Sequence, residues 1–309
     1  MITTVTLNAA IDKTYVLSDF QLGKVSRIGQ IHAVAGGKGI NAARVLHQLG
    51  IRTLATGFVG GSNGDFILKN LDQQQISHDF VKVDDESRIC LNIMNASNGE
   101  STELLEKGPL ITEQQLAEFR QKIVLLGQQS RIVIFSGSIP AGLSTSVYAE
   151  LIEALRKTNA AVFLDTSGDG LIHGLKAAPF FMKPNEDEIA QLTGKRPENE
   201  TELVQSLHQL ADSGIECASV SLGASGSMTV YKGTIYRVRV PSIEALNPVG
   251  SGDAYVAGMA AGIYQELPIE DCLRLAAACG TANALSAHAG FVKREDVDAF
   301  LKQIEIVQL

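Results

Sequence analysis

Short apolar segments rich in β-branched residues alternate with helical patterns along most of this chain, and this alternation restricts its fold more than any other feature. The segment Ile132-Val-Ile-Phe135 is apolar at every position, as expected for a strand whose two faces are covered by helices. We therefore predict a doubly wound α/β fold with a mostly parallel sheet. Strands are predicted over residues 3–8, 53–59, 131–136, 161–165, 180–183 and 217–222, and helices over 39–49, 65–74, 113–126, 145–157, 186–192, 202–212, 252–265 and 269–286.

Two regions interrupt the alternation because they show strand patterns with no helix between them. The first spans residues 11–34, with strands predicted over 14–17 and 27–34 on either side of the turn Leu22-Gly-Lys24. The second spans 88–106, with strands predicted over 89–95 and 102–105 and joined by Asn98-Gly99, a strong hairpin signal. Four strands without helices of their own could form a small second sheet that serves as a lid; decorative surface hairpins are the alternative.

Charge and apolar pattern restrict the partners of the chain. Its 309 residues carry 26 basic and 34 acidic side chains, a formal net charge of −8, which argues against nucleic acid. No apolar run reaches the roughly 18 residues that span a membrane, and the first residues lack a signal-peptide pattern. We therefore expect a cytoplasmic protein. The cysteines show no C-x-x-C spacing, which favours buried free thiols over a metal site or disulfides: Cys90, Cys217, Cys272 and Cys279.

The stretch with the clearest chemical meaning is Asn247-Pro-Val-Gly-Ser-Gly-Asp253, which leads into a small, apolar, helix-compatible run. Gly250 and Gly252 let backbone N–H groups turn inward, and a helix N-terminus adds partial positive charge, so an anion can be held here. A carboxylate beside a bound anion is unfavourable unless it accepts a proton. From this segment alone, Asp253 is either a catalytic base or a helix cap.

A second glycine cluster, Ala35-Gly-Gly-Lys-Gly-Ile-Asn41, also opens a helix. It lacks the spacing of a P-loop, and the chain has no strand followed by the G-x-G-x-x-G pattern of a dinucleotide site. What remains is a helix N-terminus with close backbone access, one lysine and one asparagine. Such a site could hydrogen-bond a polyol and neutralise a phosphate, or it could be a glycine-rich connection with an exposed lysine.

Two further stretches follow predicted strands. In Lys183-Pro-Asn-Glu-Asp-Glu188, Asn185 and Glu188 have the spacing of a capping box; alternatively Glu188 lies near a water-coordinated Mg²⁺, which needs few protein carboxylates. Ser221-Leu-Gly-Ala-Ser-Gly226 carries two glycines into a turn and is a weak signal alone.

All these segments follow apolar strands, where open α/β sheets gather ligands. Two anion-binding turns, a carboxylate for Mg²⁺ and a base together suggest phosphoryl transfer. Asp253 would accept the proton of the attacking hydroxyl, and the N–H groups of residues 250–252 would stabilise the developing negative charge.

The motifs at 35–41 and 247–253 resemble, in this order, the two signatures of the PfkB (ribokinase-like) family of carbohydrate kinases, over essentially the full length of the chain. The second signature commonly reads Asp-Thr-x-Gly-Ala-Gly-Asp. The resemblance implies a single ribokinase-like kinase domain over residues 1–309, with a Rossmann-like core and a β-sheet lid formed by insertions at about 11–34 and 88–106. It further implies ATP lying across the C-terminal half, and lids that clasp each other in a homodimer.

Within the family, the chain is most similar to kinases of already phosphorylated ketohexoses, the tagatose-6-phosphate kinases and 1-phosphofructokinases. Thr6-Leu-Asn-Ala-Ala-Ile-Asp12 resembles their Thr-Leu-Asn-Pro-x-x-Asp, and Ser136-Gly-Ser-Ile-Pro140 resembles their Ser-Gly-Ser-Leu/Ile-Pro turn. The Asn247-Pro248 pair favours the tagatose enzymes, and Asn247 puts in doubt the monovalent-cation site of some relatives.

This resemblance implies ATP- and Mg²⁺-dependent conversion of tagatose 6-phosphate to tagatose 1,6-bisphosphate. Phosphorylation of fructose 1-phosphate is the close alternative, and a sugar-phosphate binding protein without turnover is the alternative from another class. The expected catalytic residues are Asp253, Gly250 and Gly252. The expected sugar-phosphate ligands are Asp12, Arg27, Gly37, Lys38, Asn41, Arg88 and Ser138. The expected nucleotide side comprises Lys183, Asn185, Ser221, Gly223, Gly226, Ser251 and Asn283, with Glu188 holding Mg²⁺ through water.

Overall fold

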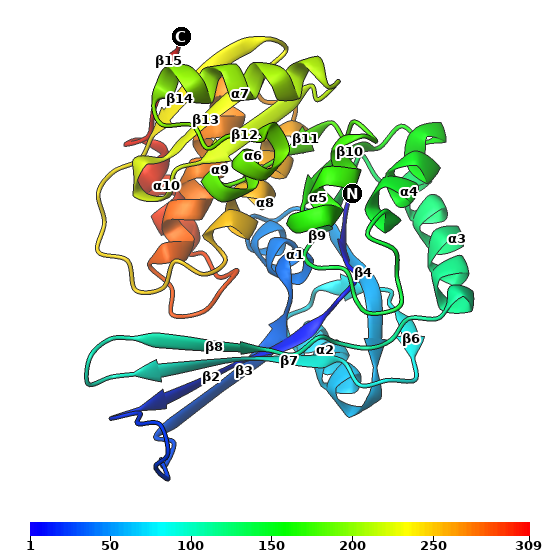
Figure 1. Ribbon diagram of the computed structural model, residues 1–309, viewed down its shortest axis with the longest axis vertical. Helices are drawn as coiled ribbons and strands as arrows, with labels where there is room; N and C mark the ends of the chain where they lie inside the picture. The colour runs from blue at the N-terminus through cyan, green and yellow to red at the C-terminus, as the bar shows by residue number, and fades with distance from the viewer.

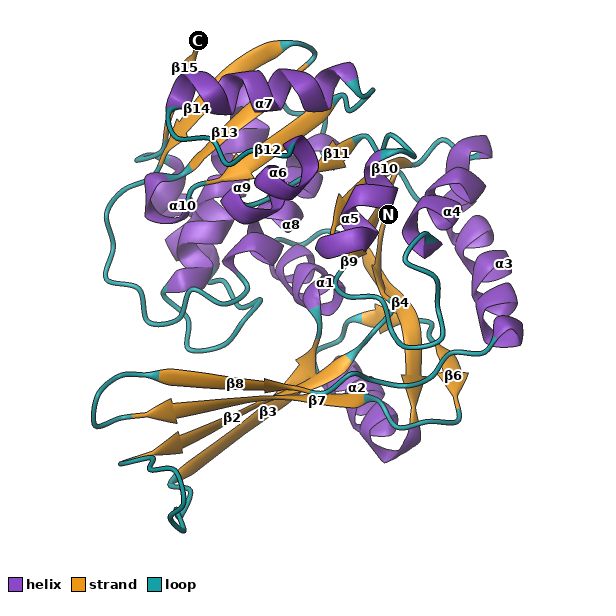
Figure 2. Ribbon diagram, viewed as in Figure 1, coloured by secondary structure: helices purple, strands orange, loops and turns teal.

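The strands of the computed structural model, which describes residues 1–309, form a large central sheet and a smaller one (Figures 1 and 2). The strand order in the central sheet is β15-β14-β13-β12-β11-β10-β9-β1-β4-β5, and β6 pairs with β4. The pairs from β12 to β5 are parallel, whereas β13, β14 and β15 add antiparallel strands at one edge. The strands are β1 (Ile2–Thr6), β4 (Thr53–Gly60), β5 (Ser77–His78), β6 (Val81–Val83), β9 (Ile132–Ser136), β10 (Ala161–Asp165), β11 (Phe181–Met182), β12 (Cys217–Ser221), β13 (Ser227–Tyr231), β14 (Thr234–Arg239) and β15 (Glu305–Gln308).

Helices cover both faces of the central sheet, as the apolar pattern of its strands predicts. In β9, Ile132 and Ile134 belong to a core cluster shared with α1, α8, α9 and α10, whereas Val133 and Phe135 belong to a cluster shared with α3 and α4. The predicted doubly wound, mostly parallel α/β fold is therefore confirmed. The helices are α1 (Lys38–Gln48), α2 (Gly61–Gln73), α3 (Glu113–Gln129), α4 (Val147–Ala154), α5 (Gly168–Leu175), α6 (Glu186–Thr193), α7 (Glu200–Asp212), α8 (Ser251–Tyr264), α9 (Ile269–Ala284) and α10 (Arg294–Leu301). None of them combines the length and the apolar character needed to cross a membrane.

The small sheet has the strand order β3-β2-β7-β8 and projects from the α/β body beside α2 (Figures 1 and 2). Its bounds are β2 (Ala10–Leu17), β3 (Gln30–Gly36), β7 (Arg88–Asn95) and β8 (Ser101–Leu105). The two insertions meet because β2 pairs in parallel with β7 along its whole length, and β3 and β8 extend the sheet as antiparallel edges. The four strands expected to form a separate small sheet do so, and the alternative of independent surface hairpins is wrong.

Several elements differ from the prediction for physical reasons. α2 begins at Gly61, earlier than predicted, because the Glu86 carboxylate accepts hydrogen bonds of 2.9 Å from the N–H groups of Ser62 and Asn63. The antiparallel edge strands β13 to β15 were not predicted, and the turn between β13 and β14 uses a non-glycine residue, Lys232, with a φ of 48°. α5 and α10 were also missed; α5 contains three glycines, and tertiary contacts override its low helix propensity.

Candidate active site

Two cavities lie at the carboxyl ends of the central strands, and the start of α8 contributes to both. The first, of about 360 Å³, lies between the small sheet and the α/β body. The second, of about 470 Å³, is bordered by the end of β12, α8 and α9. Gly250 and Asp253 line the first cavity, whereas Ser251 and Gly252 line the second. The predicted second motif thus forms the boundary between two potential ligand sites.

Backbone geometry explains the glycine that precedes α8. Gly250 is the N-cap residue and has a φ of 84°, a left-handed conformation that L side chains rarely adopt. A Cβ at this position would also lie 2.8 Å from the Cβ of Ala289. Because Gly250 itself occupies the N-cap position, Asp253 lies inside the first helical turn, and the interpretation of Asp253 as the N-cap residue is wrong.

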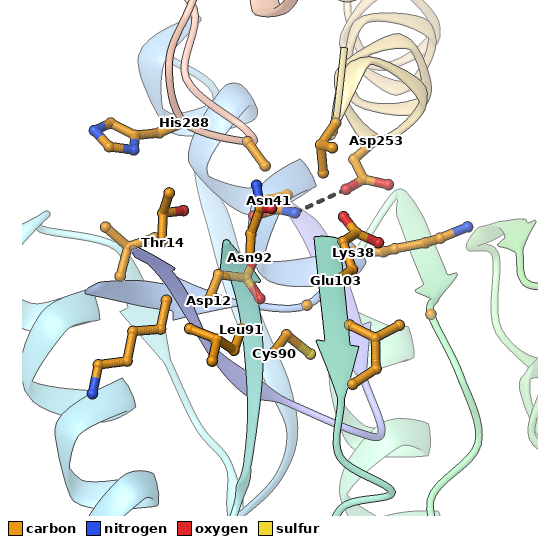
Figure 3. Close-up of a pocket in the computed structure, with 18 of the residues that line it drawn as sticks. Asp12, Thr14, Lys38, Asn41, Cys90, Leu91, Asn92, Glu103, Asp253 and His288 are labelled. Atoms are coloured by element: carbon orange, nitrogen blue, oxygen red, sulfur yellow. Dashed lines mark hydrogen bonds between the residues drawn. The ribbon is translucent and has the colours of Figure 1, made fainter. Parts of the chain in front are cut away.

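Asp253 contacts Asn41 in the wall of the first cavity. The two residues point toward one another from α8 and α1, and Asn41 Nδ2 donates a hydrogen bond of 2.9 Å to Asp253 Oδ2 (Figure 3). Burial raises the pKa of Asp253 to about 7, against the opposing effect of the Lys38 ammonium, and Asp165 raises this pKa further. A carboxyl group with a pKa near neutrality is suited to accept a proton under physiological conditions.

A buried carboxylate connects the two cavities through a pair of lysines. Asp165, at the end of β10, lies 3.5 Å from Lys38 Nζ and 3.8 Å from Lys183 Nζ. Lys38 lines the first cavity and Lys183 the second. Burial raises the pKa of Asp165, but the two lysines outweigh this and hold it below its usual value; Asp165 in turn raises the pKa of Lys38. Two ammonium groups are therefore held at the junction of the cavities.

The first cavity brings together most of the predicted sugar-phosphate ligands: Asp12, Gly37, Lys38, Asn41, Arg88 and Ser138. Burial raises the pKa of Asp12 to about 6, partly offset by Arg44 and Arg88. Arg88 Nε donates to the backbone oxygen of Asn8 (3.2 Å), and Asn8 Nδ2 donates to Ser138 Oγ (3.1 Å). Because Ser138 Oγ accepts this hydrogen bond, its own proton is free to be donated to a ligand.

Arg27 is the exception on the sugar side. It lies in the loop between β2 and β3, is exposed, and does not line the first cavity. Within one chain, Arg27 is therefore not brought to the site.

The second cavity contains most of the predicted nucleotide ligands: Lys183, Ser221, Gly223, Gly226 and Ser251. Small and apolar side chains complete its wall, among them Val240, Pro241 and Ile243. Such a wall fits a planar base with phosphates directed toward the start of α8.

Asn283 lies behind this cavity instead of lining it. Its side chain is fully buried, and its Nδ2 donates to Val249 O at 2.9 Å and to Ser251 Oγ at 3.2 Å. Its Oδ1 accepts from the N–H of Gly290 at 2.7 Å. The predicted direct contact with nucleotide is therefore corrected to a supporting role, in which Asn283 fixes the turn that precedes α8.

Asn185 and Glu188 form the expected capping box at the start of α6. Asn185 Oδ1 accepts from the N–H of Glu188 at 2.8 Å, and Glu188 Oε2 accepts from the N–H of Asn185 at 2.9 Å. Capping accounts for one carboxylate oxygen, whereas Glu188 Oε1 makes no hydrogen bond within the chain. No group of three or more His, Cys, Asp or Glu is placed to hold a metal ion. A Mg²⁺ ion here would thus take most of its ligands from phosphates and water.

The sequence patterns do not single out two residues of the site, Asp165 and Asn8. Asp165 ends a predicted strand at the edge where ligands gather, a position that could have identified it. Asn8 likewise ends the predicted strand over residues 3–8, but its contacts with Arg88 and Ser138 join segments 80 and 130 residues apart along the chain and are visible only in the fold.

Comparison with known proteins agrees with this geometry. The model of the pfkB family carbohydrate kinases matches residues 5–295. The chain belongs to the PfkB family. It is 36% identical to a tagatose-6-phosphate kinase of Staphylococcus epidermidis over 312 aligned residues, which cover the whole of both chains.

Two solved structures illustrate the shared fold. One is a Staphylococcus aureus protein assigned as a phosphofructokinase, with a TM-score of 0.87, 33% identity, and coverage of 100% of this chain and 99% of that one. The other is phosphofructokinase-2 of Escherichia coli in complex with fructose-6-phosphate, with a TM-score of 0.92, 23% identity and 98% coverage of both chains. This PfkB protein is therefore a sugar kinase with the ribokinase-like fold.

Proposed function

We propose that this PfkB kinase uses ATP and Mg²⁺ to phosphorylate a ketohexose monophosphate, converting tagatose 6-phosphate to tagatose 1,6-bisphosphate. The observation that carries the proposal is the position of Asp253, a buried carboxyl group at the boundary of two cavities, beside a helix N-terminus and two ammonium groups. Phosphoryl transfer requires such a boundary because the acceptor and the donor approach it from opposite sides.

In this mechanism Asp253 accepts the proton of the acceptor hydroxyl as that oxygen attacks. Asn41 holds the carboxylate in place through its hydrogen bond to Oδ2. The backbone N–H groups of Gly250 and Gly252, at the positive end of α8, stabilise the negative charge on the transferred group. Lys38 and Lys183 add positive charge on the two sides of this point.

The sugar phosphate occupies the first cavity. Asp12 accepts hydrogen bonds from the sugar hydroxyls, and the Asn41 amide contributes further hydrogen bonds to them. Gly37, the N-cap residue of α1, brings the N-terminus of this helix to the cavity. Arg88 and Ser138 hold the phosphate already on the sugar, for which a guanidinium and an oriented hydroxyl are well suited.

ATP occupies the second cavity, lined by Lys183, Ser221, Gly223, Gly226 and Ser251. ATP with Mg²⁺ supplies the phosphoryl group and neutralises part of its charge. Asn185 and Glu188 line neither cavity, but Asn185 pairs with Ser221 at the edge of the second one. The unoccupied Oε1 of Glu188 can accept a hydrogen bond from a metal-bound water.

A direct comparison of substrates tests the proposal. Tagatose 6-phosphate, fructose 6-phosphate and fructose 1-phosphate are compared in an assay coupled to ADP release. We expect the highest kcat/KM with tagatose 6-phosphate. Preference for fructose 1-phosphate would instead support a 1-phosphofructokinase, the close alternative from the sequence. If none of the three sugars supports ADP release but a sugar phosphate binds tightly, the protein is a non-catalytic binding protein.

We further propose that the protein is a cytoplasmic homodimer joined through its small sheets. Exposed apolar side chains on this sheet support the dimer: Ile31, Leu104 and Leu105 are 56%, 53% and 63% exposed. Arg27 can then contribute to the sugar-phosphate site only from the partner chain, since it does not line the cavity of its own chain.

A further inference from the structure

A buried arginine lies directly behind the first cavity and belongs to none of the functions described so far. Arg44 is on α1, one helical turn after Asn41, and only 1% of its surface is exposed. All four of its hydrogen bonds go to neutral oxygen atoms. A buried guanidinium without a bonded carboxylate lowers the stability of the fold, and buried charges of this kind are typical of functional sites.

The hydrogen bonds of Arg44 reach four different segments. Its Nη1 donates to Asn41 Oδ1 at 3.0 Å and to the backbone oxygen of Ala289 at 3.3 Å. Its Nη2 donates to the backbone oxygen of Ala35 at the end of β3, and its Nε donates to Gln74 Oε1 at 2.7 Å. The aromatic ring of Phe291 lies against the guanidinium, with 4.6 Å from Arg44 Cζ to the ring centroid.

The contact with Asn41 determines which end of its amide faces the base. Because Arg44 Nη1 can only donate, it requires Asn41 Oδ1 on its side, and Nδ2 is then directed to Asp253 Oδ2. The opposite amide orientation would place an oxygen lone pair against the Asp253 carboxylate. Figure 3 shows the resulting arrangement of Asn41 and Asp253.

We propose that Arg44 is a positioning residue for the phosphoryl-transfer site, which orients Asn41 toward Asp253 and places a buried positive charge one hydrogen-bonded residue away from the base. This inference rests on the proposed role of Asp253. Arg44 also holds Ala289, the residue against which Gly250 packs, so that one guanidinium supports both the base and the start of α8.

The charged surroundings agree with this role. Asp12 from β2 and Asp253 from α8 both interact favourably with the Arg44 charge, and His288, in the loop before Phe291, also faces it. Burial raises the pKa of Asp12, and Arg44 is the largest opposing influence. By reciprocity, the Arg44 charge favours the ionised form of Asp253.

Other charged groups also influence the pKa values of Asp253 and Asp12. Lys38, Asp165 and Lys183 face Asp253, whereas Arg88 and Glu103 face Asp12. None of these groups is removed by a change at Arg44.

Two substitutions separate the charge of Arg44 from its geometry. Arg44→Met removes both, and we expect kcat to fall roughly 10–100-fold and the acid limb of the kcat profile to move up by about half a pH unit or more. Arg44→Lys keeps the charge but lacks the Nη1 group that donates to both Asn41 and Ala289. It should lower kcat while leaving the acid limb near that of the wild type. The KM for ATP should stay within about twofold in both variants.

A double-mutant cycle tests whether Arg44 acts through Asn41. In an Asn41→Ala background, Arg44→Lys should cause a smaller loss of kcat than in the wild type, because the amide that it orients is gone and only the contact with Ala289 is left to lose. If the loss of kcat in the double variant equals the sum of the losses in the two single variants, expressed as free energies, the proposal is wrong.

Carboxyl titration gives a test that does not depend on turnover. In protein labelled with ¹³C at aspartate Cγ, Arg44→Met should raise the pKa of Asp253 relative to wild type, and Arg44→Lys should not. If Arg44→Met does not fold, the double-mutant cycle with Arg44→Lys still tests whether Arg44 orients the Asn41 amide. Failure of the wild-type protein to phosphorylate any of the three sugars would reject the proposed function but leave this titration interpretable.

Arg156→Lys serves as the matched control, because Arg156 also donates to a backbone oxygen, that of Ala177 at 3.2 Å, and lines neither cavity. It should leave the pH profile unchanged. If Arg44→Lys and Arg44→Met lower thermal stability but give wild-type kcat, pH profile and Asp253 titration, Arg44 is purely structural and the proposal is wrong.

Discussion

Asp253 combines two properties that oppose each other, a buried position and a charge that the proposed chemistry needs. Burial raises its pKa from 3.8 to about 7, although Lys38 and the hydrogen bond from Asn41 favour the charged form. The ionised base is therefore kept at the expense of folding stability, as at many functional sites. This conflict gives separate expectations for activity, stability and pH dependence.

Asp253→Asn should remove the base and keep the shape of the site. We expect kcat to fall by about three orders of magnitude or more, because general base catalysis contributes roughly 10²–10⁴-fold. Binding of ATP and sugar phosphate, measured by calorimetry, should remain within a fewfold of wild type. Near-normal turnover in this variant would contradict the assignment of the base.

The same variant should be more stable than wild type at high pH. A carboxyl whose folded pKa is raised loses stability as the pH rises from its unfolded value of 3.8 to about 7, and the loss is constant above that range. Asp253→Asn removes this loss, so its Tm at pH 8 should exceed that of wild type by about 2–4 °C for each kcal/mol recovered. At pH 4 the two proteins should melt together; a Tm of the variant below that of wild type at pH 8 would argue against the raised pKa.

Catalysis should depend on pH in the opposite direction. Because only ionised Asp253 can accept a proton, kcat at saturating substrate should fall about tenfold per pH unit well below pH 7. A limb near pH 7 is distinguishable from titration of the substrate phosphate itself, whose second pKa is about 6. A kcat that is constant from pH 8 to pH 5 would mean that no group with this pKa takes part.

At the scale of elements, the two glycines at the start of α8 have different structural reasons. Gly250 has a positive φ and contacts Ala289, so a side chain there strains the backbone. Gly252 has no such conformation, and a Cβ would lie 3.2 Å from the flexible end of Lys183. The first glycine is required by the fold, whereas the second keeps space beside Lys183 in the second cavity.

Alanine at each position should separate these roles. Gly252→Ala should leave Tm unchanged or slightly higher, because alanine favours helix by roughly 1 kcal/mol relative to glycine. Its KM for ATP should rise, since the methyl group displaces Lys183. Gly250→Ala, the matched comparison, should lower Tm clearly. Equal effects of both changes on Tm and on the KM for ATP would contradict this distinction.

The same element shows what the sequence could and could not predict. Glycine spacing before an apolar run predicted α8, its N-terminus and Asp253, because these are local properties of the chain. The helix start at Gly61 and the position of Arg44 between four segments depend on partners far away in sequence, such as Glu86 and Ala289. Local patterns therefore located the motif residues, whereas the groups that orient them became visible only in the fold.

At the scale of the whole molecule, the loop between β2 and β3 leaves unusual side chains in solvent. Leu22 and Val25 are 90% and 95% exposed, and Arg27 lies beside them. Apolar residues exposed to this extent are typical of a surface that another molecule covers. In the proposed homodimer, this loop is the part of one chain that can complete the sugar-phosphate site of the other.

Mixing two inactive variants tests this arrangement. Arg27→Ala keeps the base but lacks the partner contribution, whereas Asp253→Asn lacks the base but keeps Arg27. In a heterodimer, the intact Arg27 of the Asp253→Asn chain can serve the intact base of the Arg27→Ala chain. Equal co-expression should therefore restore about a quarter of the wild-type kcat/KM for sugar phosphate, because half of the dimers are mixed and each contains one complete site.

Arg88→Ala provides the control for this experiment, because Arg88 lines the cavity of its own chain. Its mixture with Asp253→Asn contains no complete site: the chain with the base lacks Arg88, and the chain with Arg88 lacks the base. Activity should then stay at the level of the separate variants. Rescue of Arg27→Ala but not of Arg88→Ala requires that the two arginines reach one substrate from different chains. Failure to rescue Arg27→Ala in verified heterodimers would instead show that Arg27 is not part of the site.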